Sequence, residues 1–241
     1  MGEGALAGDV RGLSRHCFLA GCGALAGVAA VEDAWASQAT PPGSRAWPRV
    51  RLIREDGTSL RASDLVAHLS YVFSYPFEST PCFLLDIGEE IPGSRVLVQR
   101  DVTGYAWDGG VGARRSILAY SAICPHTQTH PTRESAMINY YGPERASILA
   151  GRSKVITCCV HGSAFDVARG AVPLQPPAEV PLAAIVLEWK RDTDALYAVG
   201  IVGRPVFEQF FASFPDKARG EVGAVTRVWE LSRYTRSATP C

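Results

Sequence analysis

Two short motifs that combine cysteine with histidine constrain this chain more than any other feature of its sequence. The first is a Cys-x-His motif at residues 124–126, and the second is a Cys-x-x-His motif at residues 158–161. Each follows a short run rich in β-branched or aliphatic residues, 117–123 and 155–157, so each is expected on a loop at the end of a strand. The two loops together offer two thiolates and two imidazoles, which are metal-binding groups.

Two kinds of metal site use two cysteines and two histidines. One is tetrahedral zinc, and the other is a 2Fe-2S cluster with cysteine on one iron and histidine on the other. Zinc fingers usually place a cysteine pair on one turn and a histidine pair on a helix, whereas here each motif mixes both residue types and neither has a helical pattern. The mixed loops favour the cluster, and structural zinc and a coincidental pair of motifs remain as alternatives.

The composition indicates a globular protein with a hydrophobic core. Of the 241 residues, 47% are hydrophobic, and 24 Lys and Arg balance 24 Asp and Glu. This balance gives no electrostatic reason to expect nucleic acid as a partner. No stretch reaches the roughly 18–20 apolar residues that span a bilayer, so a polytopic membrane protein is excluded. The seven cysteines are too few for a disulfide-dense scaffold of this length.

Residues 1–36 have the pattern of an export signal. Arg15 precedes a short apolar run, 18–31, and residues 34–36 form an Ala-x-Ala cleavage site. The sequence around Arg15 resembles the twin-arginine export box, with His16 in place of the second arginine, and this route would export a folded protein. We therefore expect the periplasm, or the periplasmic face of the inner membrane if the segment remains as an anchor. A proline-rich linker, 37–48, follows.

The rest of the chain predicts an all-β fold, an antiparallel sandwich or barrel with two cluster-binding loops. One helix is expected near the end, at 206–214. The predicted division is an N-terminal β extension at 49–80, a cluster domain at 81–204 and a C-terminal helix or arm at 205–241. The expected strands lie at 50–53, 71–73, 82–85, 96–98, 117–123, 154–157, 185–189 and 196–201.

Residues Tyr75 to Gly203 resemble Rieske iron–sulfur proteins, and most of all the group of small Rieske subunits of arsenite oxidase. The resemblance implies a small antiparallel β domain that holds one 2Fe-2S cluster. Cys124 and Cys158 would bind one iron, and His126 and His161 would bind the other. Besides the two motifs, the resemblance rests on Tyr75-Pro76, residues 79–82, 110–112 and 119–121, Phe165-Asp166, Gly170, Pro177-Ala178 and Leu187-Glu188.

The resemblance also implies that Gly162, Ser163 and Phe165 tune the cluster. Ser163 is placed to donate its hydroxyl proton to a cluster sulfide, which favours the reduced state. High-potential relatives carry a tyrosine two residues after that serine, and it donates to a ligand thiolate. This chain has Phe165 there, so we expect an intermediate-to-high potential, below that of relatives with both donors.

Many relatives brace the two loops with a disulfide that cannot form here, because the corresponding positions are Thr129 and Val160. Cys159 has three interpretations: a free thiol, a disulfide partner of Cys82, or a competing ligand. Residues 127–157 form a longer segment between the motifs than is usual, either a docking surface or a plain loop.

The resemblance implies one-electron transfer without substrate chemistry of its own. The chain would be the small redox subunit of an exported, arsenite-oxidase-like oxidoreductase complex, and it would pass electrons from a larger subunit to a cytochrome or copper protein. The alternatives are the Rieske subunit of a quinol-oxidising cytochrome bc-type complex and a zinc-stabilised interaction module. An oxygenase would need a second iron site with two histidines and a carboxylate, and only His68 and His130 would remain for it.

Overall fold

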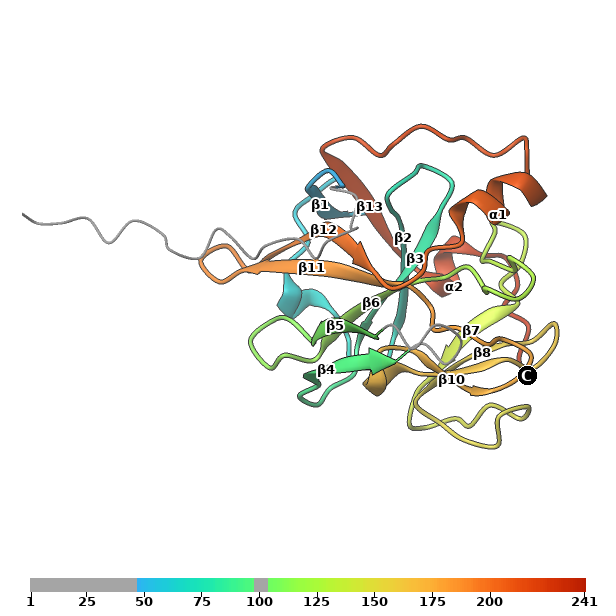
Figure 1. Cartoon of the computed structure of the whole chain (residues 1–241). Helices are drawn as coiled ribbons and strands as arrows, with labels where there is room; N and C mark the ends of the chain where they lie inside the picture. The colour runs from blue at the N-terminus through green and yellow to red at the C-terminus, as the bar shows by residue number, and fades with distance from the viewer. Residues whose placement is uncertain (1–46, 98–103) are drawn as a thin grey trace, which may run out of the picture. The chain divides into compact units, whose positions relative to one another are not determined.

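Seven strands close into a barrel in the computed structural model, which describes residues 47–97 and 104–241 (Figure 1). Neighbouring strands pair antiparallel, except that β1 and β13 pair in parallel. In order around the barrel the strands are β1 (Val50–Arg54), β12 (Ala195–Val202), β11 (Ala184–Lys190), β6 (Ile117–Ser121), β3 (Pro81–Asp86), β2 (Ser70–Ser74) and β13 (Val225–Glu230).

A smaller sheet of four strands carries the second predicted loop. It runs in the order β10 (Val172–Gln175), β9 (Ala164–Asp166), β8 (Val155–Cys158) and β7 (Ile138–Tyr141). A separate hairpin pairs β4 (Pro92–Leu97) with β5 (Gly104–Gly109). The helical elements are η1 (Ala62–Asp64), η2 (Val167–Arg169), α1 (Phe207–Ser213) and α2 (Leu231–Tyr234).

The wall formed by β3 and β6 separates two hydrophobic cores. Side chains alternate between the two faces of a strand, so Cys82 and Leu84 of β3 point into the barrel core, whereas Phe83 and Leu85 join a second core. Strand β6 divides its residues in the same way. The second core also contains buried residues of the small sheet, so burial of apolar area joins this sheet to the barrel.

The all-β prediction is confirmed, and every expected strand overlaps an observed one. The helix expected at 206–214 is α1, whose buried residues are Phe207, Phe210 and Phe211. The prediction missed β5, β7, β9, β10 and β13, and β13 is a barrel strand within the predicted C-terminal arm. The predicted export signal, 1–36, lies outside the described residues, as does all of the linker except Trp47 and Pro48.

All described residues fall within one compact unit, Thr40–Cys241. No helix in this part of the chain is long and apolar enough to cross a bilayer.

Tyr120 of β6 links the barrel to η2, which directly follows the small-sheet strand β9. Its side chain is fully buried, and its hydroxyl donates to the Val167 carbonyl at 2.8 Å. We predict that Tyr120→Phe lowers the free energy of unfolding by about 1–3 kcal/mol, because it leaves a buried carbonyl without its donor. Denaturant titration measures the change. Tyr71→Phe is the control: the Tyr71 hydroxyl accepts the Val66 N–H at 3.1 Å at an exposed site, where water replaces the lost partner, so stability should change by less than about 0.5 kcal/mol. Equal effects of the two substitutions would contradict the prediction.

Candidate metal centre

The first predicted loop leaves the barrel at the end of β6. The Cys124 N–H donates to the Thr129 carbonyl at 2.8 Å, and the Gln128 N–H donates to the Cys124 carbonyl at 2.8 Å. Gln128 has a φ of 56°, in the left-handed region that lets a chain turn back tightly. The loop thus keeps Cys124 buried and leaves His126 exposed.

The second predicted loop connects β8 to β9 and has a similar design. The Cys158 N–H donates to the Ser163 carbonyl, and the Gly162 N–H donates to the Cys158 carbonyl, each at 2.8 Å. Gly162 has a φ of 83°, a conformation that glycine adopts without the steric cost of a Cβ atom. Cys158 is therefore buried at the base of the loop, and His161 is exposed at its tip.

Each loop directs backbone N–H groups at its own cysteine sulfur. The N–H groups two and three residues after Cys124 lower the pKa of that thiol, and those two and three residues after Cys158 do the same for Cys158. Hydrogen bonds to the charged form of a group favour that form, and the thiolate is the form of cysteine that binds metal. Both loops are therefore suited to hold a thiolate ligand.

The two cysteines also contact each other. The Cys124 thiol donates a hydrogen bond to Cys158, which raises the pKa of Cys124 and lowers the pKa of Cys158. Burial raises both pKa values, and the Thr129 hydroxyl helps to lower that of Cys158. One sulfur of the pair thus carries the negative charge more readily than the other.

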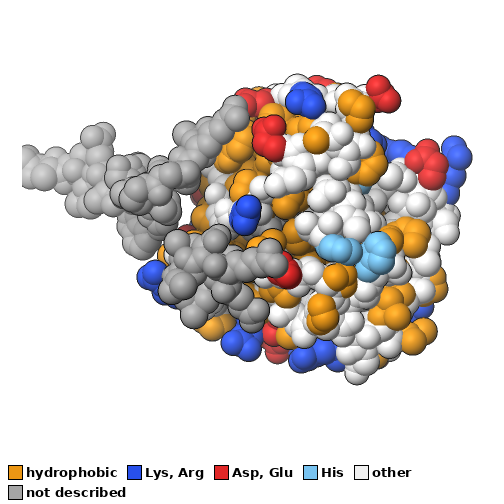
Figure 2. Space-filling view, turned by 45° about the vertical axis from the view of Figure 1, so that its right-hand side comes forward, with side chains coloured by type: hydrophobic (Ala, Val, Ile, Leu, Met, Phe, Trp, Pro, Cys, Tyr) orange, Lys and Arg blue, Asp and Glu red, His pale blue; other side chains and the backbone are white. Residues whose placement is uncertain are grey.

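The two histidines form a second pair at the surface. The ring centroids of His126 and His161 lie 5.0 Å apart, with an angle of 84° between the ring planes. Both side chains are exposed. Figure 2 shows histidine side chains together on this face, with hydrophobic side chains beside them.

The four predicted ligands therefore form two pairs, with the thiols buried and the imidazoles at the surface. Within residues 47–97 and 104–241, no three side chains of His, Cys, Asp or Glu are grouped so that they could hold a single metal ion. A mixed 2Fe-2S cluster assigns two cysteines to one iron and two histidines to the other. The observed pairs match this division of ligands, so the donor set fits such a cluster.

The residues predicted to tune the centre lie directly behind the second loop. Ser163 is fully buried, and its Oγ accepts the Ala178 N–H at 2.9 Å. Phe165 is also fully buried and shares the second core with both paired cysteines. The Gly162 carbonyl accepts a hydrogen bond from Gln175 Nε2, which also donates to the Leu149 carbonyl at 3.3 Å.

The structure decides among the alternatives for Cys159 and Cys82, and it excludes a disulfide between them. Cys159 forms a disulfide with Cys241, with Cα atoms 5.5 Å apart, so it is neither a free thiol nor a partner of Cys82. Cys82 is a free thiol buried in β3, where its Sγ donates to the Tyr75 carbonyl at 3.1 Å. The two cysteines belong to different places in the fold: Cys82 lies in the barrel core, and Cys159 lies in the loop beside the C-terminal segment.

Residues 89–186 match the family model of the Rieske [2Fe-2S] domain. Among solved structures, the chain is similar to the soluble domain of Rieske protein II from Sulfolobus acidocaldarius. The two are 23% identical, the alignment covers 64% of this chain and 78% of that chain, and the TM-score is 0.47. The family-model match over residues 89–186 implies one 2Fe-2S cluster.

His130 fixes the far end of the first loop. Its ring is buried, with ring centroids 4.9 Å from both Phe210 and Phe214 of the α1 region, and its Nδ1 lies 2.9 Å from the Gln128 carbonyl oxygen. Burial lowers the pKa of His130, and the charge of Lys217 adds to this effect.

We predict that His130 makes the protein less stable in mild acid. Because its pKa is lower in the folded state, the unfolded chain binds more protons, so the free energy of unfolding falls as the pH drops from about 7.5 through the ordinary histidine pKa of about 6.5. Denaturant titrations at several pH values should show a smaller loss of stability in acid for His130→Gln than for wild type. Identical pH profiles for wild type and His130→Gln would refute this.

Proposed function

We propose that this protein carries single electrons through a 2Fe-2S cluster, with Cys124 and Cys158 on one iron and His126 and His161 on the other. The observation that carries the proposal is the arrangement of the two loops, with both thiols buried in one core and the imidazole rings 5.0 Å apart at the surface. When bound, a cluster with these ligands accepts and donates one electron at about −150 to +300 mV.

The polypeptide would determine where the electron enters and leaves. The two imidazoles are exposed, whereas the thiols are buried, so the histidine edges would be the shortest route to another protein. Large apolar side chains of the second loop and of the segment before β8 also face solvent. Val160 of the loop is 41% exposed, and in the segment before β8 Ile148 is 81% and Leu149 46% exposed. Exposed apolar groups of this kind mark interaction surfaces, so we assign this face to the redox partner.

We further assign the chain to an exported oxidoreductase complex of the arsenite oxidase type. In this assignment a larger subunit oxidises the substrate, and a cytochrome or copper protein accepts the electron. The resemblance over residues 75–203 supports the complex. The Cys159–Cys241 disulfide supports the periplasm, because structural disulfides persist in oxidising compartments. Mass spectrometry of subunits that co-purify with the native protein tests the assignment, and a quinol-oxidising cytochrome bc complex would be the contrary result.

We predict that purified protein contains two irons and two acid-labile sulfides per chain. Cys158→Ala should contain neither, because the variant lacks one of the two paired sulfurs. Cys82→Ala is the matched control: it also removes a buried thiol, but from the barrel core, and it should keep the full cluster. Iron and sulfide analysis gives the result, and zinc without sulfide in the wild type would rule out the proposal.

The potential should respond to the residues behind the second loop. Phe165→Tyr offers a new hydroxyl beside the paired cysteines, and a hydrogen bond to a charged group contributes about 1.5–3 kcal/mol. If that bond forms only in the reduced state, the midpoint potential rises by about 60–130 mV, since 59 mV corresponds to a tenfold change for one electron. Ser163→Ala should lower the potential. Protein-film voltammetry measures both, and shifts of the opposite sign would contradict the predicted roles.

A further inference from the structure

The segment that follows the barrel strand β12 contacts both predicted ligand loops, at different points. At the first loop, Phe210 and Phe214 pack against His130, and Ser213 Oγ donates to Gln128 Oε1 at 3.3 Å. At the second loop the link is covalent, because Cys159, which follows Cys158 in the chain, is joined to Cys241. No disulfide among the described cysteines connects the two loops to each other.

The last residues of the chain are also hydrogen-bonded beside the start of β7, to the backbone of Ala136 and the side chain of Asn139. The Ala136 N–H donates to the Ser237 carbonyl at 2.8 Å, and the Thr239 N–H donates to the Ala136 carbonyl at 3.0 Å. Asn139 Nδ2 donates to the Thr239 carbonyl at 3.0 Å. Figure 1 shows the C-terminus beside the small sheet. These bonds hold the segment in place, so Cys241 is a fixed point for the loop that it joins.

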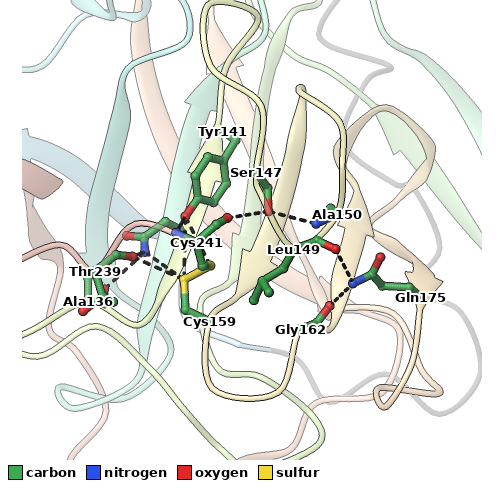
Figure 3. The surroundings of a disulfide bond; sticks show 11 residues. Ala136, Tyr141, Ser147, Leu149, Ala150, Cys159, Gly162, Gln175, Thr239 and Cys241 are labelled. Atoms are coloured by element: carbon green, nitrogen blue, oxygen red, sulfur yellow. Dashed lines mark hydrogen bonds between the residues drawn. A yellow bond between two sulfur atoms is a disulfide. The ribbon is translucent and has the colours of Figure 1, made fainter.

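A second connection reaches the other end of the same loop (Figure 3). The backbone oxygen of Cys241 accepts the Ser147 hydroxyl at 2.7 Å and the Ile148 N–H at 2.8 Å. The turn that begins there presents the Leu149 carbonyl, which shares Gln175 Nε2 with the Gly162 carbonyl. The loop is thus held at Cys159 by the disulfide and at Gly162 through this turn, and His161 lies between the two points.

We propose that the Cys159–Cys241 disulfide is a covalent clasp that positions the second ligand loop and slows loss of the cluster. Cys159 and Cys241 act as positioning residues, and neither is a ligand. The clasp rests on the proposed function, since it assumes that Cys158 and His161 bind the cluster. A connection that fixes the neighbours of both ligands restricts the loop conformations in which either ligand is released.

The test compares wild type with Cys159→Ser/Cys241→Ser, which opens the clasp without leaving a free thiol beside Cys158. Thr239→Ser is the control, because it changes the same segment but keeps the disulfide. We expect excess iron chelator to remove the cluster from the double variant about 10–100-fold faster than from wild type, the range by which residues around metal ligands change affinity. The control should lose its cluster at the wild-type rate, and an unchanged rate in the double variant would overturn the clasp.

A second measurement needs no cluster. Amide hydrogen exchange of residues 159–163 in the apoprotein should be faster in the double variant than in wild type. Faster exchange confined to residues 235–241 would overturn the proposal, because the disulfide would then tether only the C-terminal segment. A wild type that binds no cluster would refute the proposed function, and the exchange result would still decide whether the clasp exists.

The wild-type apoprotein provides the same comparison if the double variant does not fold. Treatment with a water-soluble phosphine breaks the Cys159–Cys241 bond and forms two thiols, while the phosphine takes oxygen from water and becomes its oxide. We expect exchange at residues 159–163 to rise after this treatment, and no change there would overturn the clasp.

Discussion

The candidate centre depends on the apolar core shared by the barrel and the small sheet. The first loop begins at barrel strand β6, and the second joins two strands of the small sheet, so neither sheet alone can bring the ligands together. The shared core contains Cys124, Cys158 and Phe165, together with the outward-facing residues of β3 and β6. Burial of this surface fixes the distance between the loops, and the positions of the two thiols follow from it.

Within this frame each loop meets a local electrostatic requirement. A buried thiolate is costly unless hydrogen-bond donors compensate for the water it loses. The backbone turns at Gln128 and Gly162 let each loop direct N–H groups at its sulfur, so the polypeptide supplies those donors itself. His126 and His161 are exposed, so water rather than the loop backbone surrounds their outer ring edges.

The sequence predicts these loops because their chemistry is local. A cysteine and a histidine two or three residues apart mark a loop, and apolar runs on either side of a short polar turn mark the strands β11 and β12. The Cys159–Cys241 pairing is different, because the two residues are 82 positions apart and spacing alone cannot determine disulfide connectivity. Strand β13 was missed although its residues Val225, Thr226 and Val228 favour a strand, because the polar tail that contains it predicts an arm.

The segment between the two motifs was predicted to be either a docking surface or a plain loop, and it also contributes a strand to the small sheet. Strand β7 is fully buried and pairs along β8, so part of this segment belongs to the frame of the second loop. Its turn at Ile148 and Leu149 is exposed toward solvent, while its backbone is bonded to Cys241 and Gln175. The same residues that would meet a redox partner are therefore fixed to the support of His161. Gln175 connects this turn to the ligand loop, because its Nε2 donates to both the Leu149 and the Gly162 carbonyls.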